Sequence, residues 1–158
     1  MKIKRVNEMN ETSDLNKSLS FNTPQELLEH VDNLDLGLSR AKSRFSKIIN
    51  NESFDTTLKI VNIDNLSTKL DSKVSIVENL TTEVRKFISD MNNEYKENPN
   101  MDDPKGDEIH SQLENTLTDL GMIIENLLNY KHLLDDLVDN LSAVEHITDD
   151  IIGYKFNQ

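Results

Sequence analysis

The chain has 158 residues with no cysteine and no tryptophan, and its 29 acidic residues outweigh 17 basic ones to give a net charge of −12. The absence of cysteine excludes disulfides and thiolate metal sites, and the acid excess argues against direct binding of nucleic acid, which needs clustered Lys and Arg. No apolar run has the length of a membrane span or the layout of a signal peptide. We therefore expect an intracellular protein, cytoplasmic or nuclear, without a transmembrane segment.

The composition favours long helices with a thin core. Apolar residues make up 35% of the chain, and only four Gly and three Pro interrupt it, so there are few residues to make turns. The fold class we predict is all-α: an elongated antiparallel helical bundle or coiled coil of three long helices, preceded by a disordered N-terminal tail. The helical bundle should occupy residues 23–152.

Residues 1–22 are polar and show no regular apolar spacing, which predicts the disordered tail. Ordered structure should begin at Thr23, because Thr23-Pro24-Gln25-Glu26 has the layout of a capping box with Pro at the first helical position. A first helix over about 23–50 follows from apolar residues that recur in steps of four and three. Gly37 lies inside this helix and marks either a close approach or a weak point.

A basic patch lies on the predicted first helix and contains no acidic residue. Its members are Arg40, Lys42, Arg44 and Lys47. The acidic helix predicted at the C-terminal end of the chain is the obvious complement, so we expect pairing within the chain or within one complex rather than binding of nucleic acid.

A second helix is predicted over about 56–97, with a small slip of the heptad register near Lys73 and Val74. Residues 50–55 should form a turn that makes the first two helices antiparallel neighbours, although the lack of Pro and Gly there also allows one continuous helix. Asn98 and Pro99 end the second helix, and the run to Gly106 is the clearest loop in the chain.

The third helix is predicted over about 107–152, with Asp107 as its cap and Gly153 as its stop before a short tail over 153–158. Its apolar residues keep a heptad spacing for about six heptads, and residues 107–151 hold eleven acids against the single basic residue Lys131. The helix should therefore pack against the other two and against a helix of a partner. The predicted partner-binding seam consists of Leu120, Ile123, Leu127, Leu134, Leu137, Leu141 and Val144.

The sequence offers no catalytic constellation, metal site or cofactor motif. The glycines are too scattered for a phosphate loop. The four histidines do not have ligand spacing, and we expect them to be solvated surface side chains. The acidic pairs Asp135-Asp136 and Asp149-Asp150 point different ways on a helix and read as a charged face.

These observations favour a non-enzymatic structural or adaptor subunit of a multi-protein complex that acts through helix association. By analogy of architecture alone, such helices suit kinetochore, Mediator-like or membrane-tethering assemblies. Other helical subunits are the expected partners, in a hetero-oligomer rather than a homo-oligomer. Two alternatives stay open: a monomeric helical adaptor that binds a basic partner through its acidic helix, and a metal-binding or regulatory helical bundle.

Overall fold

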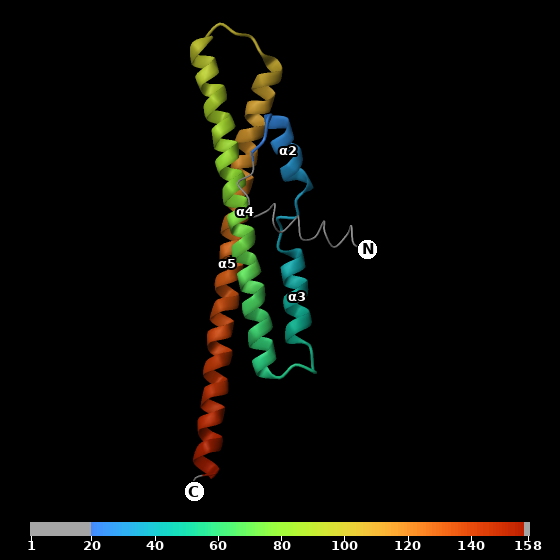
Figure 1. Ribbon diagram of the computed structural model, residues 1–158, viewed down its shortest axis with the longest axis vertical. Coiled ribbons are helices and arrows are strands. Elements are labelled where there is room, and N and C mark those ends of the chain that lie inside the picture. The colour runs from blue at the N-terminus through green and yellow to red at the C-terminus, as the bar shows by residue number, and fades with distance from the viewer. Residues whose placement is uncertain (1–19, 157–158) are drawn as a thin grey trace. The chain divides into compact units, whose positions relative to one another are not determined.

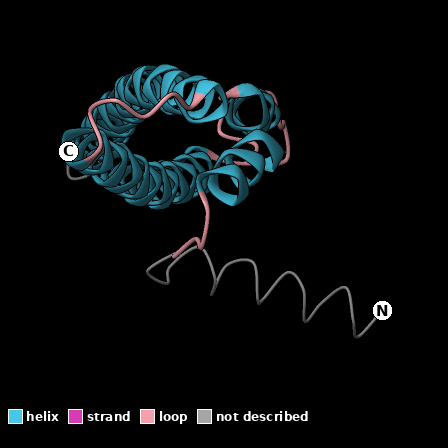
Figure 2. Cartoon of the chain, turned by 90° about the horizontal axis from the view of Figure 1, so that it is seen from above, coloured by secondary structure: helices cyan, strands magenta, loops and turns pink. Residues whose placement is uncertain are grey.

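The computed structural model describes residues 20–156, and within them the chain forms four helices and no strand. The helices are α2 (Pro24–Asn33), α3 (Ser39–Ile49), α4 (Thr56–Glu97) and α5 (Pro104–Phe156) (Figure 1). The connections between them are short loops (Figure 2). The predicted all-α class is confirmed. Most of the predicted tail, residues 1–19, lies outside the described residues.

The prediction of a single helix over 23–50 is wrong, because residues 34–38 separate α2 from α3. α2 begins as predicted: the Thr23 hydroxyl accepts a hydrogen bond from the Glu26 amide at 3.2 Å. The helix ends where Leu34 turns to extended backbone, with φ −88° and ψ 139°. Asp and Asn around Leu34 and the nearby Gly37 are weak helix formers. Of the two roles expected for Gly37, a close approach or a weak point of the predicted helix, the structure supports the second.

α5 begins three residues earlier than predicted, because Asp103 and not Asp107 caps it. The Asp103 carboxylate accepts a hydrogen bond from the Gly106 amide at 3.0 Å, and Pro104 occupies the first helical position. This is the arrangement of Thr23 and Pro24 repeated. A Cβ at Gly106 would collide with the Asp103 carboxylate, so the glycine makes room for the cap. At its other end α5 continues to Phe156, and Gly153 does not stop it.

The turn predicted over 50–55 is present and makes α3 and α4 separate helices. The Asn51 side chain accepts a hydrogen bond from the Ser53 amide at 2.9 Å. The Asp55 carboxylate accepts one from the Leu58 amide at 2.8 Å and so caps α4. Asn and Asp thus supply the turn chemistry that Pro and Gly usually provide.

The described chain divides into two compact units, and each long helix contributes to both. The first unit contains α2, residues 75–97 of α4 and residues 104–124 of α5. Its core is made of side chains with no exposed surface: Leu27, Val77, Leu80, Val84, Leu113 and Leu120. Here α4 and α5 are antiparallel, because the partners of His110 and Asp107 are Asn92 and Tyr95. Three residues forward on α4 correspond to three residues back on α5.

The second unit contains α3, residues 56–74 of α4 and the part of α5 from residue 125 onward. Its buried apolar side chains are Ala41, Ile63, Leu66, Leu70, Val74, Leu127 and Leu134. Thr57 pairs with Glu145 and Ser67 pairs with Asp135, so α4 and α5 are antiparallel here as well. Val74 and not Lys73 takes the buried place, as the predicted slip of the heptad requires.

Candidate functional site

The predicted partner-binding seam is largely used inside the chain. Leu120 has no exposed surface in the first unit, and in the second unit Leu127 has none and Leu134 has 2%. These leucines stand seven residues apart, which keeps them on the packed face of α5. Ile123, Leu137 and Leu141 are partly exposed, whereas Val144 is 61% exposed. Val144, at the C-terminal end of the seam, is therefore its one exposed member.

A second apolar stripe lies on the outside of α5 in the second unit. Leu133, Val144 and Ile147 are 64%, 61% and 57% exposed. With 3.6 residues per turn, their spacings of eleven and three place all three within about 60° around the helix. This face lies about a third of a turn from the buried leucines. We call Leu133, Val144 and Ile147 the α5 outer stripe.

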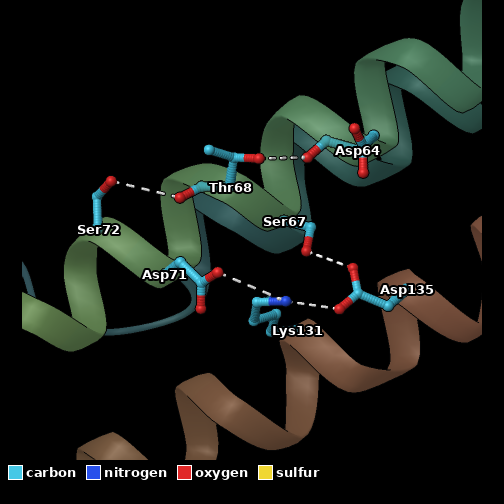
Figure 3. Close-up of polar contacts among 7 residues, drawn as sticks. All are labelled: Asp64, Ser67, Thr68, Asp71, Ser72, Lys131 and Asp135. Carbon is cyan, nitrogen blue, oxygen red and sulfur yellow. Dashed lines mark hydrogen bonds and ion pairs between the residues drawn. The ribbon is translucent and has the colours of Figure 1, made fainter.

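A polar network joins α4 to α5 in the second unit (Figure 3). Lys131 donates to Asp135 at 2.6 Å and lies 3.6 Å from Asp71. The Ser67 hydroxyl donates to the other Asp135 oxygen at 2.5 Å. The hydrogen bond from Lys131 and then that from Ser67 hold the pKa of Asp135 below its usual value, and the same Lys131–Asp135 hydrogen bond raises the pKa of Lys131. The network fixes the pairing of the two helices, since a shift of one residue would separate its donors from its acceptor.

A groove of about 600 Å³ lies between α3 and α4 in the second unit. Each helix lines it chiefly with residues of one face, three and four positions apart. The residues from α3 and the loop after it are Arg44, Lys47, Ile48, Asn51 and Phe54, and those from α4 are Asn62, Asn65, Leu66, Thr68 and Lys69. We call this the α3–α4 groove. It has an apolar floor, a rim of amides and cations, and no acidic residue.

The structure divides the predicted basic patch. Arg44 and Lys47 line the α3–α4 groove, whereas Lys42 is exposed on the opposite face of α3. Arg40 is exposed one turn before Arg44. The expected pairing with the acidic third helix is not formed by Arg44 or Lys47: neither makes an ion pair among the described residues. α5 packs against α4 through its own lysine and carboxylates instead.

Sequence reasoning missed the α4 wall of the groove. Asn62, Asn65 and Lys69 fall between the apolar positions of the predicted second helix, and nothing in the sequence places them beside Arg44 and Lys47. The available signal was the matching spacing of polar residues on two helices joined by a short turn, since such helices are antiparallel neighbours.

Two of the four histidines are not the solvated side chains that the sequence predicts. His110 is partly buried, with Nε2 2.9 Å from the Asn92 side-chain oxygen and Nδ1 3.5 Å from Glu114. His30 is partly buried beside the Phe21 ring, and its Nε2 has no hydrogen-bond partner. His132 and His146 are exposed. Both partly buried histidines serve packing within the first unit.

Among the described residues, no three His, Asp or Glu side chains come together in a way that could hold a metal ion. In the same part of the chain, no helix is both long and apolar enough to cross a membrane. The acidic pair Asp135-Asp136 is split, because Asp135 belongs to the network with Lys131 and Asp136 is exposed. Comparison of the chain with protein-family models, curated proteins and solved structures gives no match.

Proposed function

We propose that the chain is a non-enzymatic structural or adaptor subunit of a multi-protein complex, and that it binds a helix of a partner on the α5 outer stripe. The observation that carries the proposal is the exposure of Leu133, Val144 and Ile147 on one face of α5. Burying such side chains contributes about 1.5–3 kcal/mol each. Exposed apolar residues that share one face of a helix can anchor a helix of a partner.

The charge of α5 argues for a different protein rather than a second copy. Around the stripe, residues 125–147 carry Glu125, Asp135, Asp136, Asp139 and Glu145 against Lys131. Two copies joined stripe to stripe would bring two acidic helices together, which like-charge repulsion opposes. A partner helix with basic residues on either side of its apolar face would complement this surface.

The test combines the mass of the purified chain with site-specific cross-linking. Light scattering across a dilution series, with circular dichroism on the same samples, should show a helical monomer. The full chain is then expressed in its native cell with a photoreactive phenylalanine at position 133 or 147. This residue should cross-link to one different protein. The matched control is position 139, which is exposed on another face of α5.

Two results would contradict the proposal. One is equal cross-linking from positions 133 and 139, which would mean that the apolar stripe does not direct binding. The other is a cross-link from position 133 to a second copy of the chain, which would make the stripe a homodimer contact.

A second candidate function is a monomeric adaptor that recognises a basic partner by charge alone. It is supported by the burial of Leu120, Leu127 and Leu134 within the chain, which leaves the helices packed without a partner, and by the acid excess of α5. The two candidates differ in their response to Leu133→Ser. If the stripe binds the partner, the substitution should release it. If charge alone binds the partner, the affinity should instead fall with added salt and with neutralisation of the acidic residues.

A further inference from the structure

The α3–α4 groove presents two matching walls. On α3 and the loop after it, the spacing i, i+3, i+4, i+7 gives Arg44, Lys47, Ile48 and Asn51. On α4 the same spacing gives Asn62, Asn65, Leu66 and Lys69. In both walls the i+4 residue is the apolar one, so Ile48 and Leu66 form a floor between two polar rims.

Along α4 the groove runs from Asn62 to Lys69, which is about 10 Å of helix at 1.5 Å per residue. Phe54 lines the groove from the loop after α3. A groove of about two helical turns matches the span of the i, i+3, i+4 and i+7 anchors of an amphipathic helix.

The charge of the rim identifies the helix that would fit. Arg44, Lys47 and Lys69 line the groove, and none of them forms an ion pair with a carboxylate in the part of the chain that the structure describes. In a chain of net charge −12, this leaves a local positive surface around an apolar floor. The side-chain amide of Asn65 adds a donor that carboxylates accept, whereas that of Asn62 donates to the Leu58 carbonyl at 2.8 Å.

We propose that the α3–α4 groove binds an acidic amphipathic helix of a protein partner. The apolar face of that helix packs on Ile48, Leu66 and Phe54, and its Glu or Asp side chains pair with Arg44, Lys47 and Lys69. This surface is distinct from the α5 outer stripe and has the opposite charge. The chain could therefore hold an acidic helix at the groove and a basic one at the stripe, which is what an adaptor requires.

The experiment selects helices from a displayed library with the full-length Leu133→Ser/Ile147→Ser variant as bait, because the α5 outer stripe of the wild type would also select basic helices. The peptides have about 20 residues, because shorter isolated helices are marginal in water. Their apolar positions are fixed at helical spacing and their other positions are randomised among Glu, Lys, Gln and Ser. Selected peptides should be enriched in Glu over Lys. Fluorescence anisotropy then measures their affinity for purified variants.

The decisive variant is Lys47→Glu/Lys69→Glu, with one reversal on each wall. The matched control, Lys42→Glu/Lys86→Glu, also changes one lysine on α3 and one on α4, and both of its lysines are exposed outside the groove. The groove variant should bind the selected peptides about tenfold more weakly or worse, whereas the control should bind them within about twofold of the wild type. Circular dichroism confirms folding, and Lys47→Gln/Lys69→Gln replaces the reversal if that variant unfolds.

Three results would overturn the proposal. The first is that the selected peptides contain Lys as often as Glu. The second is that the groove variant and the control variant weaken peptide binding equally. The third is that the groove variant binds the peptides as tightly as the wild type. A wild-type dimer that the groove variant lacks would also overturn it, since the occupant would then be α5 of a second copy. Cross-linking from position 133 is a separate readout, so failure of the groove and failure of the stripe are distinguishable.

Discussion

Leu127 and Leu133 make a matched pair for testing how the second unit is held together. Both are leucines of α5 six residues apart, but Leu127 has no exposed surface and Leu133 is 64% exposed. Truncating a fully buried leucine to alanine costs about 2–5 kcal/mol, because apolar contact is lost and a cavity remains. Leu133 keeps roughly a third of its side chain covered, so Leu133→Ala should cost less than about 1 kcal/mol.

Thermal unfolding followed by far-ultraviolet circular dichroism resolves this difference. For a chain of this size, 1 kcal/mol corresponds to roughly 2–4 °C in Tm. Leu127→Ala should therefore lower Tm by about 6–12 °C for a cost near 3 kcal/mol, whereas Leu133→Ala should lower it by only a few degrees. Urea unfolding should give the same order. Leu127→Asp should abolish the folded second unit, because it buries an unpaired charge.

Equal destabilisation of the monomeric chain by Leu133→Ala and Leu127→Ala would contradict this prediction. That result would mean that Leu133 is packed inside the fold and is not a surface for a partner. Equal and small effects of both substitutions would instead mean that the buried heptad leucines do not hold α4 and α5 together.

The remaining predictions concern the caps and the polar network. Gly121→Ala should stabilise α5 by about 1 kcal/mol, because an added Cβ there meets nothing within 4 Å. Gly106→Ala should stabilise α5 by less, because its Cβ would collide with the Asp103 carboxylate and weaken a cap worth roughly 1 kcal/mol. When both substitutions are made in an Asp103→Ala background, urea unfolding should show no difference between them. Asp135→Asn should destabilise at pH 7, because the pKa of Asp135 is lowered in the fold and its contribution is present above the unfolded pKa. That contribution is lost as pH falls through the folded pKa, so wild type and variant should converge in urea midpoints measured at decreasing acid pH. A nuclear magnetic resonance titration should show the pKa of Asp135 moving toward its usual value in Lys131→Met, and an unchanged pKa would mean that Lys131 is not its main partner.

Local sequence patterns specified the fold class, the start of α2, the end of α3 and both ends of α4. The sparsity of Gly and Pro and the four-three spacing of apolar residues specify helices, because that spacing leaves a continuous apolar face only at 3.6 residues per turn. Thr23-Pro24 and Asn98-Pro99 were readable for the same local reason, since capping and the exclusion of Pro from helices act over a few residues. Asp103-Pro104 obeys the same rule, and reading it as loop placed the start of α5 too late.

Tertiary structure decided where the surfaces for partners lie. The break at residues 34–38 could not be predicted from spacing, because the heptad spacing of apolar residues continues across Gly37 although the helix does not. The seam of α5 looked like one partner-binding face, yet packing against α4 covers Leu120, Leu127 and Leu134 and leaves Leu133 and Ile147 exposed. The groove needed the turn at 50–55 to bring Arg44 and Lys47 beside Lys69. Local patterns fix which faces a helix has, whereas only packing decides which of those faces remain open.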